Sequence, residues 1–529
     1  MWEHEKKLID FLMNNENYSH QVSDIQIIQT HISIISIAKP FVYKFKKGVL
    51  FDFLDYSTLE KRKEYCEKEM FLNKKLCNNI YLDMVTVYDG EKLNFTGGTI
   101  FEYGIKMVYM PPENNLLFYL NDYLISDKLE LIKKHLADYY RKSKKFYEID
   151  NDKLYFSRIL HNLLECKDYM FKEHSSELFE MIKIFIDQYY DKNKSYFDAR
   201  ASNGYIADCH GDLRVDHIYV FENQICIYDC IEFNEDFRKI DIIEDISFLS
   251  MELDSLNYFS ASHDFESKII NAFKDKYAQV LLPYYKCFKS MIRAKVNMLL
   301  LSQITDDIKK SEVKNNILKY LRLSLYYIVT LNKPVLFVFM GKVGSGKSTL
   351  SNLFAQITGI EIVSSDQIRK QGVLEKGGNQ DESVDKNNYY TDQKKNAIYN
   401  QIEKNATMKL QNHQSLVIDA TYSKKEHRDA IINLCEEKTG NIVFIEVELD
   451  LKIRKNRLQK RESEPGQYSD ARLEHMEMLD NIYENTTSLE IQNFLIKFNQ
   501  ENSVYSLIRN ILSFQLEKQV KTIAHSSIS

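Results

Sequence analysis

The most regular apolar pattern in the chain is VLFVFM, residues 335–340, which contains no polar position. Such a run is typical of a parallel β-strand that is buried on both faces. Apolar residues then recur at helical spacing, at Leu350, Leu353, Phe354 and Ile357. A polar segment rich in glycine separates the two patterns, so the sequence predicts a strand, a loop and a helix in succession.

Further strand-like runs follow along the C-terminal half. They lie at residues 360–366, 415–421, 441–450 and 493–498, with helical patterns between them. Strands that alternate with helices are typical of an open parallel sheet covered by helices on both faces. The pattern therefore predicts an α/β, doubly wound parallel sheet, with a ligand site at the carboxyl ends of its strands.

The N-terminal half has a different pattern, which predicts an α+β arrangement. Residues 41–47, FVYKFKK, alternate as a strand does, and residues 57–76 place apolar side chains roughly on one helical face. Ser57 is the expected N-cap of that helix, with Glu60 completing a capping box. Residues 101–115 predict another strand, followed by an extended segment that two prolines fix.

A hairpin is predicted near the middle of the chain. The strand-like runs HIYVF, residues 217–221, and ICIYD, residues 225–229, are joined by the polar turn ENQ. A hairpin of this length brings His217 and Asp229 close together, with Asp212 in the loop before it. Two carboxylates placed in this way suit a metal-assisted phosphotransferase, which needs one to orient a hydroxyl group and one to hold Mg²⁺.

Length and local composition divide the chain into domains. Its 529 residues exceed one ordinary core, so roughly two to four domains are expected. The polar stretch at residues 306–316 leads into a helical pattern that Pro334 would end. The predicted domains are residues 1–112, 113–330 and 331–529.

Composition narrows the class of protein. Hydrophobic residues make up 44% and charged residues 28% of the chain, as in globular proteins. A formal charge of −6 does not favour a nucleic-acid partner. The N-terminus has no long apolar core, and no apolar run approaches the roughly 20 residues that cross a bilayer, so neither a secretory signal nor a membrane segment is expected. The eight cysteines form no CxxC pair, which favours a reduced, cytoplasmic protein.

The strongest chemical motif is GKVGSGKST, which lies between the predicted strand and helix. Its glycines allow backbone N–H groups to turn inward, and the helix N-terminus adds positive potential where phosphates bind. Lys347 is expected to contact the β- and γ-phosphates, and Ser348 to hold Mg²⁺. The predicted nucleotide-binding residues are Gly341, Gly344, Ser345, Gly346, Lys347, Ser348 and Thr349.

Carboxylates at two strand ends are expected to join this loop. Asp419 closes the 415–421 run and is the expected Walker B carboxylate for the metal ion. Asp366 and Arg369 follow the second strand, and they face the same side if a helix begins there. A base placed beside the γ-phosphate suits transfer to an alcohol. A helix cap with a surface partner is the alternative interpretation of Asp366 and Arg369.

Residues 333–515 resemble the small P-loop kinases, in the branch that includes gluconate-kinase-like, zeta-toxin-like and polynucleotide-kinase-like proteins. The motifs that carry the resemblance are GKVGSGKST, SSDQIRK, VIDATYSKKEHR and RKNRLQKRESEPGQYSDA. It implies that Asp366 accepts the proton of the substrate hydroxyl and that Arg369 holds the substrate. It also implies that Arg457 and Arg461, one helical turn apart, clamp the transferring phosphoryl group. A solvated helix face is the alternative for these two arginines.

The segment from HGD through the hairpin to RKIDIIEDIS resembles the aminoglycoside-phosphotransferase-like branch of the protein-kinase fold. The resemblance implies a bilobal, protein-kinase-like N-terminal half in which Asp212 is the catalytic residue and Asp229 binds the metal ion. The chain departs from the family at His217, where the kinase pattern has a metal-binding Asn. Because Mg²⁺ prefers oxygen ligands, a single metal ion or a changed catalytic loop stays open, with His217 as a candidate ligand.

In that fold a strand lysine contacts the α- and β-phosphates of ATP and pairs with a glutamate on the next helix. The resemblance selects Lys44 and Glu69 for this pair. Lys46 shares the strand face of Lys44, Glu67 is nearby, and ordinary surface charge is a further alternative. No glycine precedes Gly48, so a glycine-rich loop ahead of the lysine is missing.

Together the two halves resemble bacterial fusion proteins that join an aminoglycoside-phosphotransferase-like domain to a P-loop predicted kinase. THISIISI, CHGDLR and MIRAKVNM add to this likeness. The resemblance implies a cytoplasmic, bifunctional transferase that uses ATP and Mg²⁺ to phosphorylate a hydroxyl group of a small molecule. Aminoglycoside resistance does not follow, because the fold serves many acceptors.

Two alternatives stay open. The P-loop half could be a kinase for a nucleic-acid 5′-hydroxyl or a nucleotide sugar, although the negative charge disfavours nucleic acid. The N-terminal half could be a pseudokinase that binds a ligand and regulates its neighbour, in which case His217 marks lost metal chemistry. The sequence indicates no membrane and no protein partner.

Overall fold

A computed structural model describes the chain except for residues 1, 52–53, 123–124, 168–174, 222–223, 303, 375–391, 463–472, 492–493, 500–501 and 527–529. The chain forms two compact units. The first unit consists of residues 1–154 and 195–281, and the second of residues 155–194 and 282–529. The predicted boundary at residue 331 therefore lies within the second unit.

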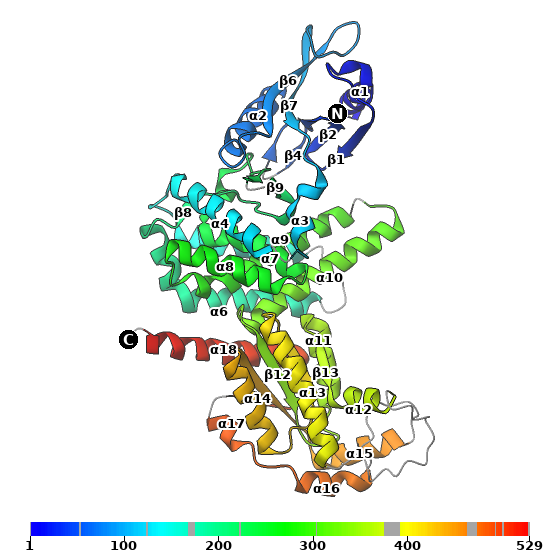
Figure 1. Ribbon diagram of the computed structural model, residues 1–529, viewed down its shortest axis with the longest axis vertical. Coiled ribbons are helices and arrows are strands. Elements are labelled where there is room, and N and C mark those ends of the chain that lie inside the picture. The colour runs from blue at the N-terminus through cyan, green and yellow to red at the C-terminus, as the bar shows by residue number, and fades with distance from the viewer. Residues whose placement is uncertain are drawn as a thin grey trace. The chain divides into compact units, whose positions relative to one another are not determined.

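The first unit begins with a five-stranded antiparallel sheet in the order β1-β2-β3-β7-β6 (Figure 1). Tyr43 and Phe45 on β3 are buried with Phe11 of α1, whereas Lys44 and Lys46 on the opposite face contact α2. The elements are α1 (Trp2–Leu12), β1 (Ile25–Gln29), β2 (Ser33–Ala38), β3 (Phe41–Lys46), β4 (Leu50–Phe51), β5 (Leu54–Asp55), α2 (Leu59–Asn73), β6 (Tyr81–Asp89) and β7 (Thr99–Val108).

The N-cap of α2 is Thr58, whose side chain accepts a hydrogen bond from the Lys61 backbone N–H at 3.3 Å. Ser57 instead donates its hydroxyl to the Asp55 carboxylate at 2.6 Å. The predicted cap at Ser57 is therefore wrong, because that hydroxyl is used in the turn before the helix.

The rest of the first unit is mainly helical around two small antiparallel pairs. The predicted hairpin is confirmed as β9 paired with β10, and β8 pairs with β11. The buried Arg200 guanidinium forms ion pairs with Asp241 and Asp275, which ties α6 to the N-cap of α7. The elements are α3 (Leu116–Tyr119), α4 (Ile125–Lys142), the end of α6 (Ser175–Ser202), β8 (Ile206–Asp208), β9 (Ile218–Phe221), β10 (Gln224–Ile227), β11 (Lys239–Asp241), α7 (Ile242–Ser255), α8 (Phe259–Phe273) and the start of α9 (Ala278–Leu301).

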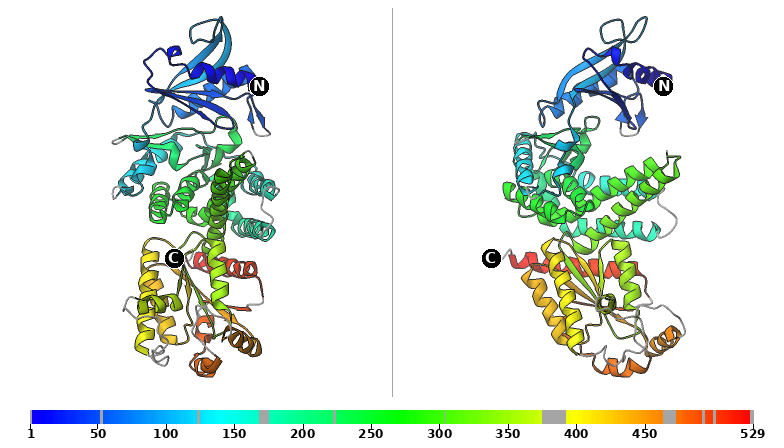
Figure 2. Two further views of the ribbon diagram at one scale, coloured as in Figure 1. Left: turned by 90° about the vertical axis from the view of Figure 1, so that its right-hand side faces the viewer. Right: turned by 45° about the vertical axis from the view of Figure 1, so that its right-hand side comes forward.

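The second unit contains a five-stranded parallel sheet in the order β13-β14-β12-β15-β16, which fits the predicted P-loop fold. Every residue of the central strand β12 is buried. Leu336 and Val338 pack with residues of α13 and α14, whereas Phe337 and Phe339 pack against Phe354 of α11. The helices therefore cover both faces of the sheet, as Figure 2 shows.

The strands of this sheet are β12 (Val335–Met340), β13 (Ile362–Ser364), β14 (Leu416–Asp419), β15 (Asn441–Glu448) and β16 (Leu495–Asn499). The helices are α5 (Arg158–Lys167), α10 (Asp307–Thr330), α11 (Lys347–Thr358), α12 (Ser365–Leu374), α13 (Asp392–Gln411), α14 (Lys425–Glu437), α15 (Leu451–Glu462), α16 (Met476–Asn481), α17 (Thr487–Ile491) and α18 (Val504–Ser526). The second strand is shorter than predicted because α12 already begins at Ser365. Within the described residues, no helix has the length and apolar character needed to span a membrane.

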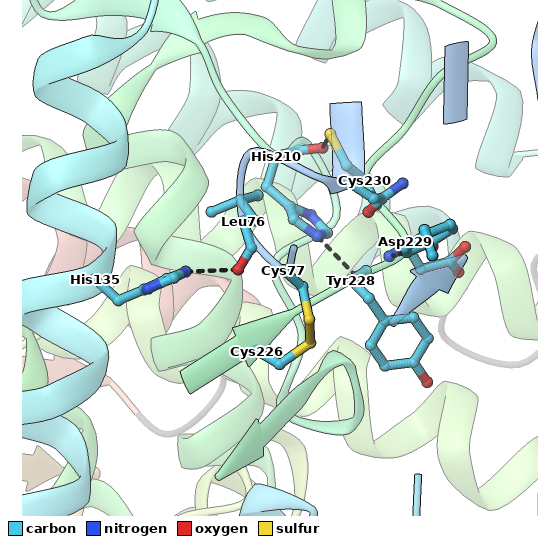
Figure 3. Close-up of a disulfide and its surroundings, with 10 residues drawn as sticks. Leu76, Cys77, His135, His210, Cys226, Tyr228, Asp229 and Cys230 are labelled. Carbon is cyan, nitrogen blue, oxygen red and sulfur yellow. Dashed lines mark hydrogen bonds between the residues drawn. A yellow bond between two sulfur atoms is a disulfide. The ribbon is translucent and has the colours of Figure 1, made fainter. Parts of the chain in front are cut away.

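A disulfide joins Cys77, which follows α2, to Cys226 on β10 (Figure 3). The two residues are 149 positions apart in the chain, and their Cα atoms are 4.8 Å apart. This bond differs from the expectation of eight reduced cysteines. The remaining six cysteines are buried thiols. The sequence carries no sign of the pair because it depends on a contact between distant segments.

Reduction of this disulfide, or the variant Cys77→Ser, is expected to destabilise the first unit by about 2–4 kcal/mol, because the crosslink restricts the unfolded chain. The measurement is thermal unfolding of the full chain with and without a dithiol reductant. Cys226→Ser is the control, since a reductant should not change its unfolding further. Eight alkylatable thiols in unreduced, denatured protein would contradict the pairing.

Candidate functional site

The glycine-rich segment of the second unit forms a tight loop between β12 and α11. Gly341 has a φ of 145°, and a Cβ atom there would lie 2.6 Å from the Val447 carbonyl oxygen, so the loop requires glycine at this position. Gly346 is the N-cap of α11, and Lys347 and Ser348 occupy its first turn. Backbone N–H groups at a helix N-terminus favour a bound phosphate.

This loop lines a pocket of about 640 Å³. The other walls are the junction of β13 with α12, the first half of α13, the segment from the end of β14 to the start of α14, and the end of α16 with the two residues that follow it. All the predicted nucleotide-binding residues from Gly344 to Thr349 line the pocket, together with Asp366, Arg369 and Asp419. Gly341 lies at the start of the loop and is not among the lining residues.

Sheet register explains how Asp419 reaches the loop. Asp419 is paired with Phe339 on one side and with Ser364 on the other, so three strands end side by side. Oδ2 of Asp419 accepts a hydrogen bond from the Ser364 hydroxyl at 3.4 Å. Among the described residues, neither Oδ1 of Asp419 nor the buried Oγ of Ser345 has a hydrogen-bond partner. A carboxylate oxygen and a hydroxyl oxygen left in this way fit a Mg²⁺–phosphate ligand.

Asp366 lies in the first turn of α12, and Arg369 follows three residues later on the same helix. The Arg369 guanidinium donates to Oδ1 of Asp366, and both side chains are partly exposed in the same pocket. The sequence expectation that the two face the same side holds in this geometry. A carboxylate oriented by an arginine beside a phosphate loop can accept the proton of a substrate hydroxyl.

The two arginines predicted to clamp the transferring phosphoryl group, Arg457 and Arg461, both lie on α15. Arg457 on α15 is half-buried and is not among the pocket-lining residues. Arg461 belongs to the same helix, but its side chain lies outside the described residues.

Arg454, one turn before Arg457, has a role that the sequence analysis missed. Its buried guanidinium donates to the Val343 carbonyl oxygen at 2.8 Å and makes two hydrogen bonds with Asp480, at 2.9 and 2.7 Å. Arg454 thus ties the phosphate loop to α15 and α16. In the sequence, Arg454 is one more arginine in a basic run, and such a run does not show which of its arginines is buried.

In the first unit, Lys44 lies between two carboxylates. Its Nζ is 2.8 Å from Oε1 of Glu69 and 2.6 Å from Oδ1 of Asp229. Burial alone lowers the pKa of the Lys44 ammonium, but the adjacent Asp229 and Glu69 carboxylates outweigh it and raise that pKa well above its ordinary value. Lys44 is therefore charged and bridges α2 to the segment after β10.

Lys46 lies on the same strand face and is more deeply buried. Its side chain is 2% exposed, against 15% for Lys44. It donates to Oε2 of Glu69 at 2.7 Å and also to Glu232, which in turn accepts from the Tyr56 hydroxyl. Because Lys46 is enclosed, Lys44 is the lysine of the two that can reach a ligand. Glu67 is 57% exposed and pairs with Lys63, away from this cluster.

The loop with Asp212 and the hairpin bring His217 between the two aspartates. His217 Nδ1 donates to the Asp212 carbonyl oxygen at 3.0 Å, and its Nε2 is 3.7 Å from Oδ2 of Asp229. A carbonyl oxygen only accepts hydrogen bonds, so Nδ1 carries a proton, and Nε2 is the ring nitrogen that faces Asp229. The loop and the hairpin therefore bring Asp212, His217 and Asp229 together.

Asp245 on α7 anchors the loop that carries Asp212. Its buried carboxylate accepts hydrogen bonds from the backbone N–H groups of His210 and Gly211, at 3.0 and 2.9 Å. His210 in turn donates from Nε2 to the Tyr228 carbonyl oxygen at 2.9 Å, beside the disulfide (Figure 3). Burial lowers the pKa of His210, so this ring is neutral. Asp245 falls in the RKIDIIEDIS segment, where sequence analysis gave it no role.

Metal binding by protein groups alone is not indicated in the described ranges. No three His, Cys, Asp or Glu side chains there are grouped so as to hold a metal ion. A Mg²⁺ ion at Ser348 and Asp419, or at Asp229 and His217, would therefore be held jointly with phosphate oxygens.

Comparison with known sequences finds a family model that matches the P-loop region. Residues 336–485 match a family described as an AAA domain, and this range includes the phosphate loop, Asp366 and Asp419. Over 448 residues the chain is also 25% identical to an uncharacterised protein of Mycobacterium tuberculosis, a match that covers 80% of this chain and 84% of that protein. An uncharacterised protein of Mycobacterium bovis matches to the same extent. The likeness thus extends well beyond the P-loop region, without an assigned activity.

Several solved structures match part of the chain at low similarity. A sugar kinase from Janibacter is 20% identical, with a TM-score of 0.26, and the match covers 35% of this chain and 94% of that one. A gluconokinase from Sinorhizobium meliloti is 15% identical, with a TM-score of 0.25, covering 37% and 98%. An ethanolamine kinase from Plasmodium vivax is 14% identical, with a TM-score of 0.35, covering 56% and 81%. Likenesses this low say nothing about activity, so the case for function rests on the AAA-domain match and the geometry of the P-loop pocket.

Proposed function

We propose that the second unit is an ATP-dependent kinase that phosphorylates a hydroxyl group of a small molecule. The observation that carries the proposal is that one pocket contains the phosphate loop with Lys347, the Asp419 carboxylate and the Asp366–Arg369 pair. A phosphate-binding loop alone would serve many nucleotide-dependent activities. A carboxylate that can act as a base in the same pocket favours transfer to an alcohol.

The proposed reaction moves one phosphoryl group. The acceptor oxygen forms a bond to the γ-phosphorus, the bond from that phosphorus to the β,γ-bridging oxygen breaks, and its electron pair leaves on ADP. Asp366 takes the proton of the acceptor hydroxyl, and Arg369 orients Asp366 and the acceptor. Lys347 neutralises charge on the phosphates, while Mg²⁺ near Ser348 and Asp419 would supply further charge neutralisation.

For the first unit we propose a protein-kinase-like fold with a second nucleotide site. Lys44 paired with Glu69, and in contact with Asp229, supports this assignment, as does the position of Asp212 beside His217. Asp212 would act on an acceptor hydroxyl, and Asp229 with His217 would hold a metal ion. A regulator that binds nucleotide without transferring phosphate is the second candidate, favoured by the histidine in the metal-binding position.

Transfer of labelled γ-phosphate from ATP with Mg²⁺ tests both proposals. The full chain is offered sugars, nucleosides, aminoglycosides and oligonucleotides, as wild type, Lys347→Ala and Asp212→Ala. Lys333→Ala, at an exposed position ahead of β12, is the matched control. Loss of product only in Lys347→Ala makes the second unit the catalyst and the first a ligand-binding regulator. Separate products lost in the two variants make both units active, whereas survival of every product in Lys347→Ala contradicts the kinase assignment of the second unit.

A further inference from the structure

The first bend of the phosphate loop is a β-turn over residues 342–345. The Ser345 backbone N–H donates to the Lys342 carbonyl oxygen at 3.2 Å, which closes the turn. Gly344, at the third position, has a φ of 79°, whereas Val343, at the second, does not have a positive φ. A type II turn has a φ of about +80° at its third position, and a type I turn has about −90° there. The peptide bond between Val343 and Gly344 is therefore the central peptide of a type II turn.

The two turn types differ mainly in the direction of this central peptide. In a planar trans peptide the C=O and N–H groups point in opposite directions. Turning the peptide over would thus exchange the places of the Val343 carbonyl oxygen and the Gly344 N–H. Glycine adopts positive and negative φ about equally readily, so Gly344 itself does not select one direction. The observed direction therefore depends on contacts from outside the turn.

Arg454 on α15 makes such a contact. Its Nε donates to the Val343 carbonyl oxygen at 2.8 Å, and its two terminal nitrogens donate to the Asp480 carboxylate on α16, at 2.9 and 2.7 Å. The Arg454 side chain is buried, and its two bonds to Asp480 fix the plane of the guanidinium. The Val343 carbonyl oxygen is thus held toward α15, and the Gly344 N–H points away from the guanidinium.

Packing keeps the turn against the same two helices. A Cβ atom at Gly344 would lie 3.2 Å from the Arg454 carbonyl oxygen. The Val343 side chain lies in an apolar cluster with Leu458 of α15 and Met476 of α16. Arg454 is not among the described residues that line the phosphate pocket, whereas Gly344 is. Arg454 therefore contacts the turn from outside the pocket.

We propose that Arg454 is a positioning residue for nucleotide binding by the second unit. It keeps the Gly344 N–H directed at the nucleotide phosphates and the Val343 carbonyl oxygen directed away from them. With the peptide turned over, that oxygen would face the phosphates and repel them, whereas backbone N–H groups attract anions. Asp480 acts through Arg454, because it fixes the guanidinium. The inference rests on the proposed kinase function and deepens it.

Photolabelling of the full chain with an azido derivative of ATP and Mg²⁺, followed by proteolysis and mass spectrometry, measures nucleotide binding to each unit separately. Competition with ATP, ADP and adenosine gives their dissociation constants at the second unit. Arg454→Met combined with Asp480→Leu removes the guanidinium without leaving the Asp480 carboxylate unpaired. We expect ATP and ADP to bind roughly ten-fold or more weakly to this variant, and adenosine to bind within about two-fold of wild type.

The ratio between the adenosine and ADP affinities separates positioning from folding. A second unit that is only less stable binds both ligands less tightly in the same proportion, because only the folded fraction binds. Lys455→Met, at the exposed position next to Arg454 on α15, is the matched control and should change neither affinity. If the double variant does not fold, Arg454→Lys decides. A lysine keeps the charge but cannot hold Val343 and Asp480 with the same planar geometry, so ADP affinity should fall while adenosine affinity stays unchanged.

The outcomes separate this inference from the kinase function. If the azido nucleotide does not label the second unit of the wild-type protein, the kinase function fails, and the inference fails with it. If the wild type is labelled and the variants keep its ratio of adenosine to ADP affinity, Arg454 has no positioning role, while the kinase function stands. An equal loss for adenosine and ADP gives Arg454 a structural role alone and likewise overturns the inference.

Discussion

Replacing Asp366 by asparagine is expected to slow phosphoryl transfer by roughly 10²- to 10⁴-fold, since an amide cannot take the hydroxyl proton. Nucleotide affinity should change by less than about two-fold, because the phosphate loop supplies those contacts from the other wall of the pocket. The measurements are single-turnover transfer from ATP and the dissociation constant of a non-hydrolysable analogue. Glu361→Gln, which removes an exposed carboxylate before β13, is the matched control.

Two results would contradict this role. Transfer at the wild-type rate in Asp366→Asn would show that another group, or the nucleotide itself, takes the proton. A large loss of analogue affinity with little loss of rate would instead place Asp366 among the nucleotide contacts. Arg369→Lys offers a graded comparison, because a lysine keeps the positive charge but cannot hold Asp366 with the same planar geometry.

The C-terminal sheet could be predicted because buried parallel strands have near-continuous apolar sequences. β12 is apolar at every position, and the motif between β12 and α11 demands glycine where the backbone passes close to Val447. The carboxyl ends of parallel strands meet at one edge, so Asp419 could be placed beside the loop from its position alone. This part of the site could be predicted because its functional residues directly follow or end the strands of the sheet.

Other features depend on contacts between segments that no local pattern connects. Arg454 meets Val343 across 111 residues, and Cys77 meets Cys226 across 149. Lys395 and Lys424 come together at the pocket only because α13 packs against α14. In the sequence, the charged residues resemble ordinary surface residues and the two cysteines resemble ordinary thiols. Only the fold shows which distant part of the chain each of them meets.

The ion pairs of the buried Glu69 have two roles in the first unit: they position Lys44, and they hold β3 against α2. Glu69 is fully buried and accepts from two lysines, one of which also contacts Asp229. Burial alone raises the pKa of Glu69, but the Lys44 and Lys46 ammonium groups outweigh it and lower that pKa below its ordinary value. The carboxylate is thus ionised, and it fixes Lys44, which would contact the nucleotide proposed for the first unit. The same contacts hold β3 against α2.

Glu69→Ala is therefore expected to destabilise the first unit by about 3–5 kcal/mol, since the change leaves buried lysine charge without a full partner. Glu67→Ala on the same helix is the matched control and should stay within about 0.5 kcal/mol, because Glu67 is exposed. Urea unfolding of the full chain, followed by a probe in the first unit, gives both values.

Glu69→Gln separates the two roles of Glu69, because it keeps hydrogen bonding but removes the charge. If Glu69→Gln keeps stability and loses nucleotide binding to the first unit, Glu69 acts by positioning Lys44. Equal stability of Glu69→Ala and Glu67→Ala would contradict a network that supports the fold.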